Sequence, residues 1–195
     1  MRQLLTLNNE GKLALRSGNG REIAHRESNV LLLLDTSGSM AGNKIQQAKS
    51  GAVDFAHSAS AKGYSTALAV FADRAAMVCD PVADSGTLAS KIAKVDVGIV
   101  GGSTNLAAGL VLAGKFAELA AVVVVTDGAS NNNRTALDAS TLLKSRGVEI
   151  ICIGTDDADT NFLRQLATRV DLATHVSAQN LRGSIQDVSR LLPKG

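Results

Sequence analysis

The chain has 195 residues, of which 45% are hydrophobic, and it carries 20 Lys and Arg residues against 18 Asp and Glu residues. This length and apolar content suit a single domain of ordinary size with a full hydrophobic core. A formal net charge of +2, an aromatic content of 3% and the absence of Trp exclude the basic surfaces and stacking platforms of typical nucleic-acid binders. We therefore expect neither nucleic acid nor a membrane among the partners.

The cysteines and the N-terminal residues give no signal for a zinc site or a membrane segment. Cys79 and Cys152 lie far apart in the sequence and in no CxxC motif, so we expect buried free thiols and no zinc site. The apolar stretch at the N-terminus is too short for a signal peptide, and no stretch reaches the roughly 20 apolar residues of a membrane helix. These observations predict a cytoplasmic protein.

The first part of the chain differs from the rest. Leucines in residues 4–7 and 13–15 flank a turn-rich tetrapeptide at residues 8–11, which predicts a small β-hairpin followed by a polar linker. We therefore divide the chain into an N-terminal hairpin extension over residues 1–28 and one domain over residues 29–195.

From residue 29 onward, short apolar stretches alternate with longer segments in which apolar residues recur every three or four positions. Continuous apolar stretches are typical of parallel strands that helices bury on both faces. The sequence therefore predicts an α/β fold with a doubly wound, mostly parallel sheet and helices on both faces. Residues 71–78 indicate a hairpin, so one edge strand is expected to be antiparallel. The predicted strands cover residues 30–34, 67–71, 121–125, 148–153 and 173–176.

The helical segments have one apolar face each, as expected of helices that cover a sheet. Asn43 is predicted to cap the first of them, and Gly63 to end it. The predicted apolar faces run over residues 45–59, 88–95, 106–117, 136–143 and 181–192.

Hydroxyl and carboxylate side chains gather in three separate loops. Asp35, Ser37 and Ser39 follow the apolar stretch at residues 30–34, and alternate residues of an extended segment point the same way. Thr104 lies in a Gly-Gly-Ser-Thr-Asn loop, and Asp127 ends another apolar strand. Ligands of doubly wound sheets bind beyond the carboxyl ends of the strands, where these loops are expected to meet. Hard oxygen ligands favour Mg²⁺, with Mn²⁺ or Ca²⁺ as possible substitutes.

This pattern closely resembles the von Willebrand factor type A (VWA) domain, whose metal-ion-dependent adhesion site (MIDAS) reads Asp-x-Ser-x-Ser, then a distant Thr and a distant Asp. All five positions are filled in this chain, in the order that the family has. The resemblance extends from about residue 29 to about residue 192 and implies a Rossmann-like VWA fold.

The resemblance also implies how the metal is held. Ser37 and Ser39 match residues that bind the metal directly, and Asp35 and Asp127 match residues that usually act through water. The residue matching Thr104 binds in either way. In the family, a partner protein supplies an Asp or Glu to the remaining coordination position. The resemblance thus implies a metal-dependent protein–protein interaction module, adhesive or adaptor in role, and no enzyme.

Enzymatic alternatives fit the residues less well. In a phosphatase-like hydrolase, Asp35 would be the nucleophile and Asp127 would help to hold Mg²⁺, but such sites usually place a second Asp where this chain has Ser37. A Ser-His-Asp hydrolase lacks its Gly-x-Ser-x-Gly elbow, and a nucleotide-binding P-loop lacks its Gly-Lys-Ser or Gly-Lys-Thr. The hydrolase that uses Asp35 is the alternative that we retain.

Several charged residues and histidines have simpler interpretations. Lys44 and Arg134 lie in or just after the loops of the predicted site, where they could attract an acidic partner, but the sequence favours ordinary solvated charges. His25, His57 and His175 occur in unrelated contexts and are predicted to be surface residues.

Overall fold

A six-stranded sheet forms the centre of the computed structural model, which describes residues 4–7, 13–16, 28–128 and 130–192. The strand order is β5-β4-β3-β6-β7-β8, and all neighbouring strands are parallel except β5, which runs antiparallel to β4. This arrangement confirms the predicted fold class, including the antiparallel edge strand. The strands are β3 (Ser28–Asp35), β4 (Tyr64–Phe71), β5 (Ala75–Val82), β6 (Ala121–Thr126), β7 (Glu149–Thr155) and β8 (Ala173–Val176).

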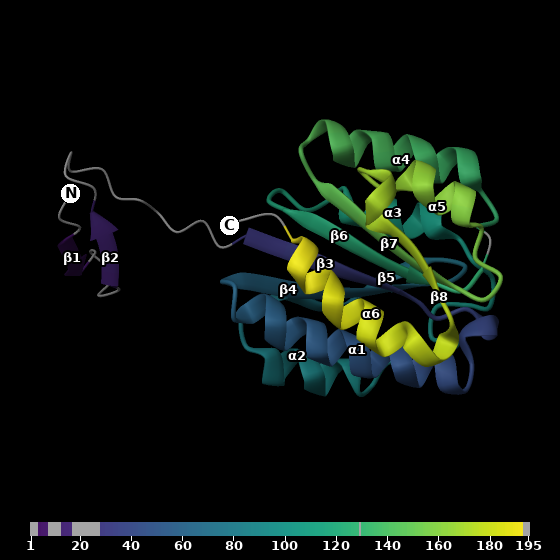
Figure 1. Cartoon of the computed structure of the whole chain (residues 1–195), viewed down its shortest axis with the longest axis horizontal. Helices are drawn as coiled ribbons and strands as arrows, with labels where there is room; N and C mark the ends of the chain where they lie inside the picture. Colours follow the sequence, from purple (N-terminus) through teal and green to yellow (C-terminus); the bar gives the residue numbers. More distant parts are fainter. Residues whose placement is uncertain (1–3, 8–12, 17–27, 129, 193–195) are drawn as a thin grey trace.

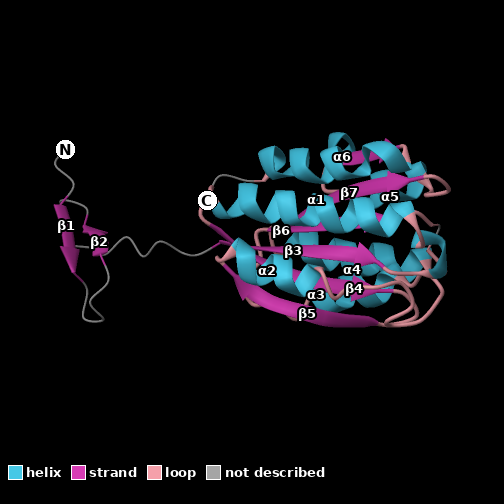
Figure 2. Cartoon of the chain, turned by 90° about the horizontal axis from the view of Figure 1, so that it is seen from below, coloured by secondary structure: helices cyan, strands magenta, loops and turns pink. Residues whose placement is uncertain are grey.

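Helices cover both faces of the sheet (Figure 1). On one face α1 contacts both α6 and α2, and on the other α4 contacts both α3 and α5. Figure 2 shows the same layers after a quarter turn. The first group comprises α1 (Asn43–Ser60), α2 (Ser85–Ile92) and α6 (Leu181–Val188), and the second α3 (Leu106–Ala113), α4 (Asn133–Ser145) and α5 (Thr160–Leu166). Single turns of 3-10 helix lie at Gly38–Met40, Val170–Leu172, Ala178–Asn180 and Ser189–Leu191.

The core consists of the two central strands and the helix faces above and below them. Every residue of β6 is buried, as are the six residues of β3 from Val30 onward, because helices cover both faces of these strands. Glycine allows the closest helix contact: a Cβ on Gly51 of α1 would lie 2.9 Å from the backbone oxygen of Arg182 in α6. Cys79 and Cys152 are both buried and free, as predicted.

Some helix boundaries differ from those predicted. The helix that begins at Leu106 ends at Ala113, and an irregular segment leads from there to β6. Gly42, with a φ of 77°, precedes the first residue of α1, so Asn43 lies inside the helix and does not cap it. The short helix α5 was not predicted. The sequence does carry its signals: Asp159 precedes it as a capping residue and accepts two backbone N–H groups, and Phe162, Leu163 and Leu166 form its buried face.

The N-terminal strands β1 (Leu4–Leu7) and β2 (Leu13–Arg16) pair antiparallel in a separate two-stranded sheet, as the predicted hairpin requires. The predicted turn at residues 8–11, the linker up to residue 27 and His25 lie outside the described residues. His57 and His175 are exposed, as predicted. Among the described helices, none combines the length and the apolar character needed to cross a membrane.

Candidate metal centre

The candidate site lies at the carboxyl end of β3 and its neighbours. β3 and β6 are adjacent and parallel, with Leu34 opposite Val125, so Asp35 and Thr126 end their strands at the same level. The helix that follows β3 and the helix that follows β6 cover opposite faces of the sheet (Figure 1). The loops therefore diverge above these two strands, where doubly wound sheets commonly bind their ligands.

Asp35 is fully buried, and hydrogen bonds engage both of its carboxylate oxygens. Oδ1 accepts the backbone N–H of Ser37 at 2.8 Å, and Oδ2 accepts the hydroxyl of Thr126 at 2.6 Å. Burial raises the pKa of Asp35 above its usual value, and the hydrogen bonds from Thr126 and Ser37 oppose this effect only in part. Asp35 thus fixes the shape of the loop and is itself shielded from solvent.

Two serine hydroxyls connect this loop to Asp127. The hydroxyls of Ser37 and Ser39 lie 3.1 Å apart, and the Ser39 hydroxyl donates to Oδ1 of Asp127 at 2.7 Å. Ser37 and Asp127 are buried, whereas Ser39 is exposed. The row of oxygen atoms therefore begins inside the protein and reaches solvent at Ser39.

Thr104 joins the same group through a loop that lies against the Asp-Thr-Ser-Gly-Ser segment. The Gly98 N–H donates to the Thr36 carbonyl oxygen at 2.8 Å, and the Gly38 N–H donates to the Gly102 carbonyl oxygen at 3.1 Å. The Thr104 hydroxyl lies beside the residue after Asp127, because a Cβ on Gly128 would lie only 3.1 Å from Thr104 Oγ1. The structure thus brings together all five predicted residues, which come from three loops.

Lys44 also belongs to this group, although the sequence favoured a solvated charge. Its ammonium donates a short hydrogen bond to Oδ2 of Asp127 and lies 3.2 Å from Oδ2 of Asp156. Arg134, by contrast, is exposed. The missed signal was the position of a cation in the first turn of a helix, where the helix dipole disfavours it and a nearby carboxylate is required.

Two observations show whether these residues fit a metal: the type of ligand atom that they offer, and the contact of Lys44 with Asp127. Within residues 28–128 and 130–192, no three His, Cys, Asp or Glu side chains cluster as metal ligands, so a transition-metal site rich in nitrogen or sulfur is not expected there. The oxygens of Ser37, Ser39, Thr104 and Asp127 suit a hard divalent cation. A cationic group of the chain already lies against Asp127, which shows that this position favours positive charge. The residues therefore fit the predicted metal.

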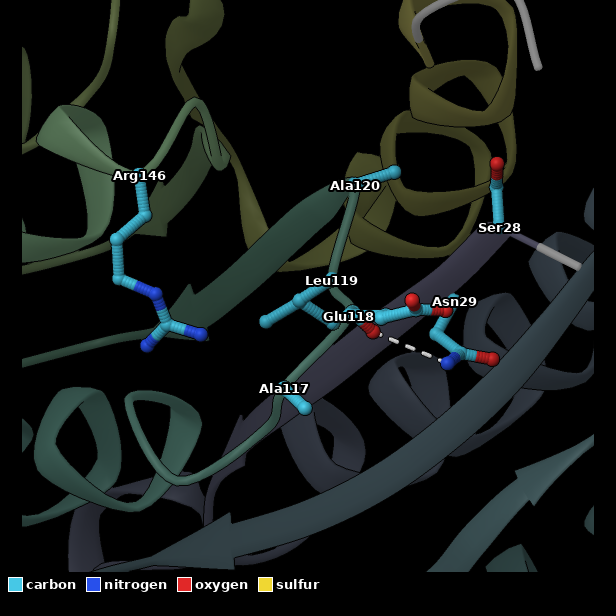
Figure 3. Close-up of a pocket in the computed structure, with 7 residues that line it drawn as sticks. All are labelled: Ser28, Asn29, Ala117, Glu118, Leu119, Ala120 and Arg146. Carbon is cyan, nitrogen blue, oxygen red and sulfur yellow. Dashed lines mark hydrogen bonds between the residues drawn. The ribbon is translucent and has the colours of Figure 1, made fainter. Parts of the chain in front are cut away.

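A polar hollow of about 330 Å³ lies at the opposite end of the sheet, where β3 and β6 begin (Figure 3). Its polar groups bond mainly to backbone carbonyls: the Asn29 amide donates to the Glu118 carbonyl oxygen at 3.0 Å, and the Arg146 guanidinium donates to the carbonyl oxygens of Gly114, at 2.6 Å, and Phe116. These contacts fasten the irregular segment after α3 to the start of β3 and the end of α4.

Comparison with known proteins agrees with this architecture. The family profile of the von Willebrand factor type A domain matches residues 29–190. No curated protein is similar enough to the chain to count as a match.

Several solved structures share the fold. The proximal thread matrix protein 1 of the mussel byssus, in a structure with a zinc-occupied MIDAS motif, has a TM-score of 0.72 at 22% identity over 85% of this chain and 45% of its own. The vWF domain of the pili tip protein Mfa5 from Porphyromonas gingivalis gives 0.74 at 13% identity, over 86% and 97% of the two chains. Manganese-loaded TRAP protein of Plasmodium vivax gives 0.66 at 19% identity, over 82% and 72%. The chain thus spans less than half of the mussel protein, and at these identities the likeness concerns the fold.

Proposed function

Because the chain belongs to the von Willebrand factor type A domain family, we propose that it is a metal-dependent protein–protein interaction module. In this proposal, Ser37, Ser39, Thr104, Asp35 and Asp127 hold one divalent cation, for which Mg²⁺ is our first choice. A partner protein supplies an Asp or Glu carboxylate to the metal. The observation that carries the proposal is the continuous row of hydroxyl and carboxylate oxygens that joins buried Ser37 and buried Asp127 through exposed Ser39.

The charge of the donor set supports the choice of a carboxylate as the partner's ligand. The oxygens of Asp35 accept from the Ser37 N–H and the Thr126 hydroxyl, whereas those of Asp127 accept from Ser39, itself a proposed ligand, and from the Lys44 ammonium. Asp127 is therefore the main carboxylate available to a cation. A divalent cation held largely by neutral hydroxyls keeps most of its positive charge and attracts an anionic ligand. The exposed position of Ser39 leaves room for that ligand to approach from solvent.

An apolar side chain at the rim of the site supports a protein partner. Ile99 is 50% exposed. It follows Gly98, whose N–H bonds to the loop of Ser37, and the N–H of Arg74 bonds to the Val100 carbonyl oxygen on the other side. The turn is therefore fastened on both sides of Ile99. Protein interfaces commonly surround a polar anchor with such apolar contacts.

The same geometry disfavours the hydrolase alternative. A nucleophilic Asp35 would need a carboxylate oxygen that is free to attack a substrate, but its side chain is fully buried and both oxygens accept hydrogen bonds. We therefore propose that the chain has no catalytic activity at this site. The fold relatives that are zinc-occupied and manganese-loaded add support for a bound divalent metal.

Thermal unfolding of the full chain tests metal binding. A cation that binds only the folded state stabilises it by about 2.7 kcal/mol at one hundred times its Kd. The melting temperature should therefore rise with saturating Mg²⁺ or Mn²⁺ relative to EDTA. The variant Ser37→Ala/Ser39→Ala should lose this rise, while Ser90→Ala/Ser145→Ala, at exposed helix positions, should keep it. Identical melts of the unmodified chain with and without metal would contradict the proposal.

Partner capture tests the second half of the proposal. The unmodified chain, coupled to a resin, should retain its partner from a cell extract in Mg²⁺ and release it in EDTA. Ser37→Ala/Ser39→Ala should retain none. A partner held equally well in EDTA, or by the serine variant, would show that binding does not pass through the metal. A metal-dependent turnover of a generic phosphomonoester would instead favour the hydrolase.

A further inference from the structure

Lys44 occupies an electrostatic position that the proposed interaction module does not require. Its ammonium donates to Asp127 on one side and lies 3.2 Å from Oδ2 of Asp156 on the other. The Lys44 side chain is 19% exposed, against 0% for Asp127 and 40% for Asp156. The ammonium therefore lies between an inner carboxylate, which belongs to the metal site, and an outer carboxylate at the surface.

Neither the helix nor the burial of Lys44 accounts for this position. Lys44 is the second residue of α1, whose first turn holds no acidic residue, and the positive end of a helix dipole repels an ammonium. Burial alone lowers the pKa of Lys44, but the hydrogen bonds to Asp127 and Asp156 outweigh it, so the pKa is raised overall. The two carboxylates therefore keep the ammonium in place.

The outer carboxylate is held in a specific conformation. Asp156 is the only non-glycine residue with a positive φ, 51°, among the described residues. Nε2 of His175, on β8, lies 3.0 Å from the Asp156 carbonyl oxygen. Asp156 therefore turns out of β7 at a fixed point and presents its carboxylate to Lys44.

Lys44 and a metal would bind the same residue. Asp127 receives the Ser39 hydroxyl on Oδ1 and the Lys44 ammonium on Oδ2. A divalent cation bound to Asp127 would add two positive charges close to this ammonium. Like charges that share one carboxylate repel strongly where solvent is excluded. Asp156, being half exposed, can hold the ammonium without the help of Asp127.

We propose that Lys44 is an internal counter-ion that competes with the divalent metal for Asp127, and that metal binding shifts its ammonium onto Asp156. This inference rests on the proposed metal-binding function. It explains how the buried Asp127 is neutralised when no metal is bound, and it makes metal affinity depend on two residues that do not ligate the metal. A metal-free chain would be folded, with its site closed by its own cation.

Calorimetric titration of Mn²⁺ into the full chain tests the exchange. Lys44→Met removes the competing charge and should lower the Kd about tenfold, which corresponds to about 1.4 kcal/mol. Asp156→Asn removes the acceptor for the displaced ammonium and should raise the Kd. In a chain that already carries Lys44→Met, Asp156→Asn should have little further effect, because no ammonium remains to be displaced.

Two controls separate the exchange from simpler effects. Lys115→Met makes the same change in net charge at an exposed position beyond the far end of α3 and should leave the Kd unchanged. Lys44→Arg keeps the charge and should bind Mn²⁺ no more tightly than the unmodified chain. If Lys44→Met is unfolded without metal, Mn²⁺ should restore its folded circular dichroism spectrum.

The outcomes distinguish this inference from the function on which it rests. If the unmodified chain binds Mn²⁺ but Lys44→Met binds no more tightly, the exchange is wrong and the metal site stands. Strictly additive effects of Lys44→Met and Asp156→Asn would also overturn the exchange, because they would indicate independent electrostatic influences. If neither the unmodified chain nor Lys44→Met binds Mn²⁺, both the metal site and the exchange are wrong.

Discussion

The two ends of the central sheet carry polar groups of different chemistry. At the end near Arg146 and Asn29, a guanidinium and an amide donate to backbone carbonyl oxygens and hold the segment after α3 to β3 and α4. At the end near Asp127, serine hydroxyls bond to each other and to a carboxylate, and the Lys44 ammonium neutralises that carboxylate. Polar groups at both ends bond within the chain, and those near Asp127 are hydroxyl and carboxylate oxygens gathered beside a cation.

A hollow by itself does not indicate a binding site, because bonds within the chain can already satisfy the polar groups that line it. In the hollow of about 330 Å³, the Asn29 amide bonds to the Glu118 carbonyl oxygen (Figure 3), and Arg146 bonds to the carbonyl oxygen of Gly114. The end near Asp127 differs because its oxygen atoms include a buried carboxylate that a cation must balance. Perturbing either end, with metal affinity or the free energy of unfolding as the readout, tests this difference.

The largest effect is expected from pH on metal binding at the end near Asp127. Because the folded-state pKa of Asp35 is raised above its unfolded value of 3.8, the metal-free fold is favoured below that value, and this contribution is lost as the pH rises through the folded pKa. Above the folded pKa, Asp35 is ionised and a bound metal can offset its charge. As the pH falls through the folded pKa, Asp35 takes up a proton and the metal should lose affinity.

Melting curves of dialysed, metal-free protein with and without Mn²⁺ measure this effect. The separation between the two curves should shrink as the pH falls through the raised folded-state pKa of Asp35. Ser37→Ala/Ser39→Ala should show a single curve across the same range. A separation that stays constant into acid would contradict the role given to Asp35.

An intermediate effect is expected from a substitution at the opposite end of the sheet, near Arg146. Arg146→Ala removes the hydrogen bonds to the carbonyl oxygens of Gly114 and Phe116 and should reduce the free energy of unfolding by about 1 kcal/mol. The Kd for Mn²⁺ should not change, because these contacts lie at the other end of the sheet. Urea unfolding and calorimetry measure the two quantities. A large loss of metal affinity in Arg146→Ala would show that the two ends of the sheet are coupled.

The smallest effect concerns the fit around Thr104. A Cβ on Gly128 would lie 3.1 Å from the Thr104 hydroxyl oxygen, so Gly128→Ala should displace that oxygen slightly and weaken Mn²⁺ binding roughly threefold, which is less than 1 kcal/mol. Gly102→Ala is the matched control in a neighbouring loop, since its Cβ would meet nothing within 4 Å. Equal affinities of the two variants would argue against a contribution from Thr104.

Local patterns predicted the parts of this molecule that depend on local chemistry. Apolar stretches predicted the buried strands, because residues such as those of β3 and β6 are continuous in sequence and covered on both faces. The convergence of Asp35 and Asp127 was predictable because both follow parallel strands, and parallel strands end at one edge.

The remaining features depend on contacts between distant segments. The end of α3 at Ala113 was missed although Gly114 follows it as the C-cap residue, because the apolar spacing continues to Ala117. The pairing of Lys44 with Asp156 joins residues 112 positions apart through an unusual φ at Asp156. The hydroxyl of Thr126, which satisfies Asp35, was also missed, because its role appears only when β3 and β6 lie side by side.

We propose that the oxygens at the carboxyl ends of β3 and β6 hold a divalent metal. An anomalous difference map from a crystal of the full chain grown with Mn²⁺ tests it most directly. We predict one strong peak bounded by Ser37, Ser39, Thr104 and Asp127. A crystal grown with Mn²⁺ whose map has no peak among these residues would contradict the account.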